Sequence, residues 1–319
     1  MGAYLLRRLA STVLVFFLIT IVVFTLIHLA PGDPIAMQIP PDQYTSATQD
    51  FIAAKRHELG LDRALPIQYL TWIGHAFTGD LGLSIVNGRP VSEIIGERIV
   101  PTLELMSLGM ILAIVIALVF GTWAAVRKNR IVDYVITFFS MLTISTPGFF
   151  IGIMAIYLFS VKLKLLPSAG MSTTGVHTTA DALKHLILPV TILGLTMSAG
   201  LLRFVRGAMI SELTADYQRT ALAKGLTRGG VVVKHVFRNA LIPILTVIAY
   251  MIPQLLSGAV LIESVFAWPG MGSMVVDEAA KNDFPVLIAF AMLTAILVLL
   301  SNLVADVLYT LVDPRVKLR

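Results

Sequence analysis

The sequence DYQRTALAKGLTRGGVVVKHVFRN, residues 216–239, is a polar and basic segment between two long apolar segments. Together with its N-terminal approach, from Arg203 to Arg238, it carries seven lysine and arginine residues. Positively charged loops between membrane spans are retained in the cytoplasm. The segment is therefore expected to be a cytoplasmic loop, and its length and charge indicate a docking element for another protein.

The composition is that of a membrane protein. Hydrophobic residues make up 57% of the chain and charged residues 13%, and the mean hydropathy is +0.85. A span needs roughly 20 apolar residues to cross a bilayer core. Continuously apolar runs of this kind predict helices, because the strands of a membrane barrel alternate. We expect an all-α polytopic protein with six transmembrane helices, at residues 9–30, 102–125, 132–161, 185–202, 240–266 and 286–311.

The distribution of charge predicts the orientation. With both termini in the cytoplasm, fifteen lysine and arginine residues lie inside and nine outside, as the positive-inside rule requires. The net charge of +5 is explained by this topology and gives no reason to expect a nucleic-acid partner. The expected organisation is an uncleaved anchor helix at 1–30, an extracytoplasmic helical cap at 31–100 and a transmembrane core at 101–319 that contains the cytoplasmic loop 203–240. Within the cap, helices are predicted at 46–59 and 66–77, stopped by Gly60 and near Gly79.

Motifs for catalysis and metal binding are missing from the sequence. It has neither a G-x-S-x-G elbow nor a G-x-x-x-x-G-K-[ST] phosphate loop, so it is not expected to hydrolyse ATP. The chain has no cysteine, and its six histidines are dispersed without ligand spacing. No catalytic residue, metal site or cofactor of its own is predicted.

Polar residues at membrane depth are candidates for function, because burying them is costly unless they find a partner or line a cavity. Glu263 and Asp306 are expected either as satisfied structural carboxylates or as a relay for a proton or cation. Glu104 is expected in the first turn of a helix after Pro101. Gly148 and Gly152 have the spacing that lets two helices approach closely. Four polar residues are predicted to line a wide, weakly selective path: Thr143, Ser145, Ser198 and Asn302.

The residues from Ala215 to Leu226 in the first half of the basic loop favour a helix, which Gly225 and then Gly229 and Gly230 are expected to end. Ala221 and Gly225 lie four residues apart on one side, with Arg219 and Lys224 nearby. Small side chains let a short helix enter the groove of another protein, and charges set its register. The alternative is an ordinary basic loop held by lipid headgroups.

Motifs along nearly the whole chain resemble one family. RTALAKGLTRGGVVVKHVFRNALIPIL, residues 219–245, is similar to the EAA loop of binding-protein-dependent ABC transporter permeases, in the form seen in the dipeptide, oligopeptide and nickel branch. The position of the general glutamate is held by Arg219 or Thr220, as in that branch. Further matching motifs are LLRRL (5–9), HLAPGDPI (28–35), ELGLDRALPIQYL (58–70), GDLGLSI (79–85), PTLEL (101–105), ESVFAWPGMG (263–272) and LVDPRVKLR (311–319).

The resemblance implies a type I importer permease in the bacterial cytoplasmic membrane. Its implied partners are a second homologous permease, two ATPase subunits that bind ATP and Mg²⁺, an extracytoplasmic solute-binding protein and membrane lipid. The implied contact with the ATPases is a coupling helix, for which the matching residues are Arg219, Thr220, Ala221, Leu222, Ala223, Lys224 and Gly225.

Peptide is the first substrate expected from the resemblance, with nickel, a metal chelate or glutathione as alternatives in the same family. Two other classes stay open. An ion-coupled secondary transporter would use Glu263 or Asp306 and need no ATPase, and an intramembrane enzyme would act without other subunits.

Overall fold

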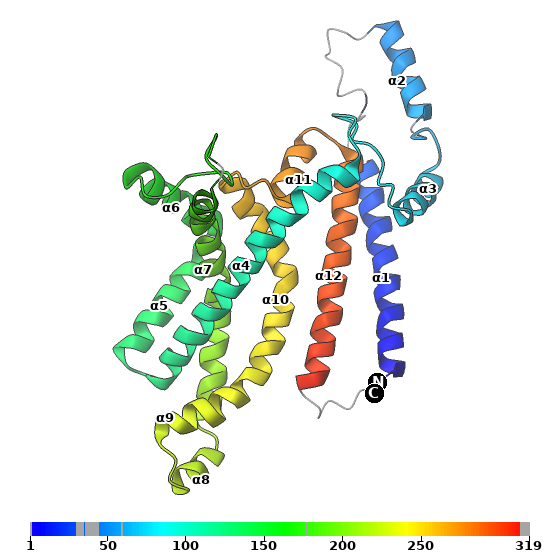
Figure 1. The fold of residues 1–319 in the computed structure, drawn as a ribbon. Coiled ribbons are helices and arrows are strands. Elements are labelled where there is room, and N and C mark those ends of the chain that lie inside the picture. The colour runs from blue at the N-terminus through cyan, green and yellow to red at the C-terminus, as the bar shows by residue number, and fades with distance from the viewer. Residues whose placement is uncertain (1, 30–34, 36–44, 59, 177, 313–319) are drawn as a thin grey trace. The chain divides into compact units, whose positions relative to one another are not determined.

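The computed structural model describes residues 2–29, 35, 45–58, 60–176 and 178–312 (Figure 1). These residues form helices and connecting segments, and in this part of the chain the only β-type pairing is an isolated bridge between Leu83 and Pro90. The predicted all-α class is confirmed. The motifs HLAPGDPI and LVDPRVKLR fall partly outside the described residues.

Among the described residues, five helices are long and apolar enough to cross a membrane. They agree with five of the six predicted spans, although most are longer than predicted because polar residues at their ends continue the helix. They are α1 Gly2–Leu29, α4 Val91–Val126, α7 Thr179–Leu213, α10 Phe237–Val265 and α12 Phe284–Val312.

The remaining predicted span, 132–161, is divided into two helical parts. α5 covers Ile131–Ser145, and α6 Gly148–Ala155 continues into the π-helical segment η3 Ile156–Lys162. The two parts are bent by 103°. Thr146 and Pro147 between them have extended backbone angles, because a residue before proline is driven out of the helical region. With this bent pair counted as one span, the described residues contain six candidate spans.

α4 begins ten residues before Pro101, so the prediction that Glu104 lies in the first turn of a helix is wrong. Pro101 lies inside the helix, and its carbonyl oxygen accepts a hydrogen bond from Trp268 Nε1 at 3.0 Å. A tertiary contact thus stabilises a helix at a residue that normally interrupts one.

By its contacts the chain divides into two compact units, residues 1–100 with 273–299 and residues 101–272 with 300–319. In the first unit, Thr20 of α1 is hydrogen-bonded to Tyr69 Oη of α3, Leu65–Phe77, at 2.9 Å. α2 covers Ser46–Glu58, and Gly60 and Gly79 follow the two helices with φ of 67° and 87°. The stop signals read from the sequence are confirmed, because glycine adopts positive φ without strain.

The second unit has its core between α4, α5, α7 and α10. A Cβ atom at Gly109 of α4 would lie 2.7 Å from Leu193 Cδ2, and one at Gly194 of α7 would lie 2.8 Å from Leu112 Cδ2. Glycine at these positions lets the two helices approach closely. Gly148 and Gly152 of α6 also contact neighbouring helices, with Cβ positions 3.2 Å from Thr196 and 3.3 Å from Val265, so the predicted close approach is confirmed.

Candidate functional site

The polar segment between α7 and α10 folds as a helical hairpin at the ends of these two helices (Figure 1). α8 covers Tyr217–Ala223, and α9, Arg228–Val231, follows after a short turn. The helix predicted at Ala215–Leu226 is therefore shorter at both ends. The second limb runs from α9 through the π-helical segment η4 Val232–Val236 directly into α10.

The turn after α8 is built by glycine. Gly225 has φ of 86°, and its N–H donates to Leu222 O at 2.9 Å, while Leu226 N–H donates to Ala221 O at 3.3 Å. These two bonds form the Schellman pattern that closes a helix. Thr227 then caps α9 by accepting a hydrogen bond from Gly230 N–H. The predicted stop at Gly225 is confirmed.

α8 is fastened to the end of α7 by a short bridge. Tyr217 Oη donates to Glu212 Oε2 at 2.7 Å, and Gln218 Nε2 donates to the Glu212 carbonyl oxygen. Burial of the phenol and its bond to Glu212 raise the pKa of Tyr217. The bridge was not predicted from the sequence, and no pattern separates this Glu–Tyr pair from any other polar pair in the loop.

In α8, Ala221 is buried, Tyr217 and Gln218 are half-buried against α7, and the remaining side chains are exposed. Ala221 belongs to the same core cluster as Val231 and Val236, so it points into its own chain and is not available to enter the groove of another protein. This corrects the expectation that Ala221 supplies the small contact surface. The exposed residues of the predicted coupling segment are Arg219, Thr220, Leu222, Ala223, Lys224 and Gly225.

The outward surface of the hairpin combines apolar and cationic groups. The side chains of Leu222 and Leu226 are 40% and 39% exposed. Within the described part of the chain, Arg219 and Lys224 form no ion pair. The hairpin thus presents two partly exposed leucines beside two cations.

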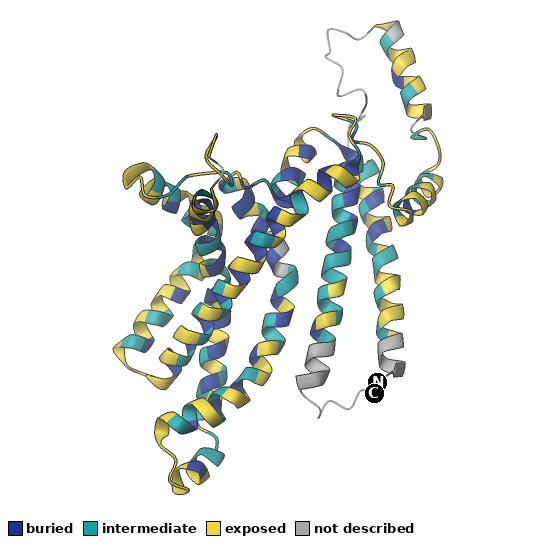
Figure 2. Cartoon of the chain, in the orientation of Figure 1, coloured by how far each residue is buried: buried dark blue, intermediate teal, exposed yellow. Residues whose placement is uncertain are grey.

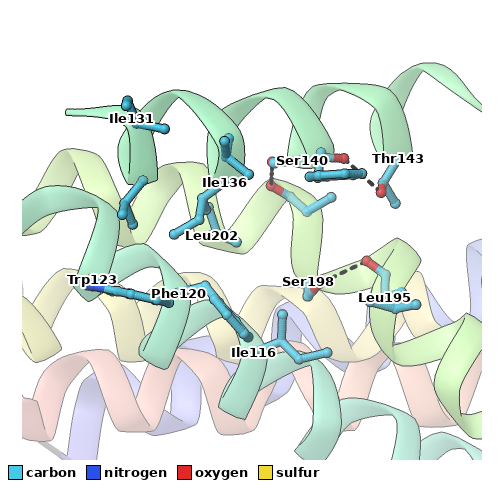
Figure 3. A pocket seen from close by; sticks show the side chains of 14 residues that line it. Ile116, Phe120, Trp123, Ile131, Ile136, Ser140, Thr143, Leu195, Ser198 and Leu202 are labelled. Carbon is cyan, nitrogen blue, oxygen red and sulfur yellow. Dashed lines mark hydrogen bonds between the residues drawn. The ribbon is translucent and has the colours of Figure 1, made fainter. Parts of the chain in front are cut away.

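The four residues predicted to line a polar path are only partly together. Thr143 of α5 and Ser198 of α7 line a groove of about 440 Å³ between α4, α5 and α7 (Figure 3). Ser145 and Asn302 are not among its lining residues. Thr143 Oγ1 donates a hydrogen bond to Phe139 O, and Ser198 Oγ donates one to Leu195 O. Each hydroxyl hydrogen is therefore bonded to a backbone carbonyl of its own helix. The lining is overwhelmingly apolar.

The two membrane carboxylates have different surroundings. Glu263 near the end of α10 is completely buried; Thr102 Oγ1 donates to Oε1 at 2.6 Å and Gly272 N–H to Oε2 at 2.7 Å. Asp306 of α12 is half-buried. The hydrogen bonds that Glu263 accepts thus favour a structural role for its carboxylate over a role as a proton relay.

Comparison with known proteins assigns the chain to a family. Residues 117–318 match the family described as "Binding-protein-dependent transport system inner membrane component", and residues 1–106 match the N-terminal domain of the same kind of component. The chain is 40% identical to the oligopeptide transport system permease protein AppB of Bacillus subtilis, over 99% of this chain and all of that protein. It is 38% identical to the glutathione transport system permease protein GsiC of Salmonella typhimurium, over 98% of both.

A protein of Brucella suis biovar 1, whose name describes a peptide permease, is 41% identical to this chain over 98% of both chains. A solved structure titled "Crystal structure of an amino acid ABC transporter with histidines" matches with a TM-score of 0.48 at 14% identity, covering 68% of this chain and 94% of the other. The assignment rests on the sequence matches, which extend over nearly the whole length. The chain belongs to the family of binding-protein-dependent transport system inner membrane components.

Proposed function

We propose that this chain is one half of the translocation pathway of an importer for peptides, driven by ATP hydrolysis in separate partner subunits. The proposal of peptide as substrate is supported by the relatives from Bacillus subtilis and Brucella suis, whose names refer to peptides. The observation that carries the coupling role is the hairpin: a short helix rooted in the core through Ala221, with an apolar and cationic surface turned outward.

In the proposed mechanism, two ATPase subunits bind ATP and Mg²⁺ and hold α8 through its exposed residues. Because α9 and η4 are continuous with α10, a displacement of the hairpin is passed on to a spanning helix without an intervening loop. A second homologous permease pairs with this chain, and an extracytoplasmic solute-binding protein delivers the cargo. Alternating access then follows from rigid-body movement of the two permeases.

The proposed orientation places the hairpin and both termini in the cytoplasm. It is supported by the excess of lysine and arginine on that side, and by the need of the hairpin to reach subunits that use cytoplasmic ATP. The segment with α2 and α3 then lies outside the membrane, where a solute-binding protein would dock.

Replacement of Leu222 by Asp tests the coupling surface. A carboxylate at a desolvated apolar contact is expected to weaken binding of the ATPases by about 2 kcal/mol or more, roughly thirtyfold. Uptake of a labelled oligopeptide in cells and co-purification of the ATPases are measured, with the membrane level of the chain as reference. We expect both to fall at least tenfold while the membrane level stays normal.

The matched control is Val176→Asp, because Val176 is 37% exposed, close to the 40% of Leu222, and lies in the loop before α7, on the opposite side of the membrane in the proposed topology. It is expected to leave uptake within about twofold. Normal ATPase recovery and unchanged uptake in Leu222→Asp would contradict the coupling role of α8. Gly225→Trp is a poorer test, since φ of 86° at Gly225 makes any side chain strained there.

Glutathione is the second candidate substrate, supported by the relative named for it. In the same cells, uptake of labelled glutathione is therefore measured beside uptake of the labelled oligopeptide. Uptake of glutathione without uptake of oligopeptide would replace the peptide proposal and leave the coupling role untouched.

A further inference from the structure

The groove between α4, α5 and α7 ends at a strongly basic turn. Trp123 lies near the end of α4, and Ile131 and Val132 begin α5; all three line the groove (Figure 3). The turn that joins these helices holds Arg127, Lys128 and Arg130, all exposed. Three cations therefore lie in the turn between lining residues of an apolar groove.

No carboxylate neutralises these three cations among the described residues. The nearest acid in sequence, Asp133, is buried and already paired: Arg206 donates to its two oxygens at 2.6 and 2.7 Å. Asp133 also accepts a hydrogen bond from Asn129 N–H at 3.0 Å, which fixes the turn. The turn is thus ordered and has an unbalanced positive charge.

Two aromatic side chains place this turn at the surface of a bilayer. Trp123 and Tyr134 flank it and are 48% and 65% exposed. Tryptophan and tyrosine are enriched at the level of lipid headgroups, because their rings are apolar and their tips polar. The groove therefore runs from the headgroup region inward.

The length and lining of the groove fit a hydrocarbon chain. From Ile131 to Thr143 the helix α5 rises about 18 Å at 1.5 Å per residue, and one leaflet of the hydrocarbon core is about 15 Å thick. The hydroxyls of Ser140, Thr143 and Ser198 all donate to backbone carbonyls. What remains exposed to an occupant is mostly carbon, and much of α5 faces outward (Figure 2).

We infer that this groove is a binding site for an anionic phospholipid, with an acyl chain between α4, α5 and α7 and the headgroup phosphate on Arg127, Lys128 and Arg130. A zwitterionic lipid would fill the groove equally well but gain less from the turn, since each lysine or arginine near a membrane surface attracts anionic lipid. The charge at the mouth selects the class of lipid.

Quenching of Trp123 fluorescence by brominated lipid tests the site. The assembled importer and the chain alone are placed in nanodiscs that contain either phosphatidylglycerol or phosphatidylcholine with brominated acyl chains at equal mole fraction. The Trp123→Phe variant is subtracted to isolate this residue from Trp72 and Trp268. We expect an apparent preference of about tenfold for phosphatidylglycerol at Trp123, falling to about one when Arg127, Lys128 and Arg130 are all replaced by Gln.

The matched control is Arg127→Lys with Arg130→Lys, which keeps the charge and is expected to keep the preference. Equal quenching by the two lipids in the parent chain would overturn the proposal. Quenching that is present in the chain alone but lost in the assembled importer would also overturn it, because the second permease would then cover the groove.

Discussion

Glu263 shows how single residues connect distant parts of the second unit. Its carboxylate accepts hydrogen bonds from Thr102 and Gly272, and Thr102 Oγ1 also accepts one from Met271 N–H at 2.7 Å. A Cβ atom at Gly270 would lie 2.3 Å from this carboxylate, and one at Gly272 would lie 2.5 Å from Val260 Cα. The PTLEL and ESVFAWPGMG motifs are therefore two halves of one hydrogen-bonded cluster.

Replacement of Glu263 by Leu is expected to destabilise the chain. The hydroxyl of Thr102 and the N–H of Gly272 lose their buried acceptor, at a cost of about 1–3 kcal/mol each. The midpoint of thermal unfolding in detergent should fall by several degrees. The midpoint should fall less in Glu263→Gln, because the amide oxygen of glutamine can still accept a hydrogen bond from Thr102. A Glu263→Leu protein as stable as the parent would show that these hydrogen bonds do not contribute to the stability of the chain.

Among the structural elements, α8 depends on its bridge to α7. Burial and the bond to Glu212 raise the pKa of Tyr217 in the folded protein. At a pH at which the phenol begins to ionise in the unfolded chain, it is therefore still protonated in the folded chain and still donates its hydrogen bond. The contribution of the bridge is thus fully present below the unfolded pKa of about 10. It is lost as the pH rises through the higher folded pKa.

A spin label measures this dependence directly, because the chain has no native cysteine. With the label on Thr220→Cys, the mobility of α8 should be constant between about pH 7 and 9 and increase above about pH 10. In a Tyr217→Phe background the alkaline change should disappear. A pH-dependent mobility that persists without the phenol would assign the change to another group.

The bend between α5 and α6 is the element that sequence patterns predicted least well. The run 132–161 is mostly apolar, with Asp133 near its start, and length alone predicts one span. The break at Thr146 and Pro147 needs the contacts of Gly148 with Thr196 and of Gly152 with Val265 and Phe266. These contacts hold α6 against α7 and α10.

On the scale of the whole molecule, the proposed orientation fixes which side each polar segment faces. Thr78 follows α3 and Thr220 lies in α8, and both are exposed. Single cysteines at these positions should react with a membrane-impermeant maleimide from opposite sides. We expect Thr78→Cys to be labelled in right-side-out vesicles and Thr220→Cys only in inverted ones. Labelling of both from the same side would contradict the topology.

Sequence patterns were sufficient to predict the helical class, the apolar segments that can span a membrane, the helix ends at Gly60, Gly79 and Gly225, and the family. These features depend on apolar length, glycine and local motifs, which are properties of neighbouring residues. The inward direction of Ala221, the contact of Glu263 with Thr102 across 161 positions and the apolar groove between α4, α5 and α7 are seen only in the folded chain. Which face of a helix is buried, and which distant groups meet, depends on packing summed over the whole unit.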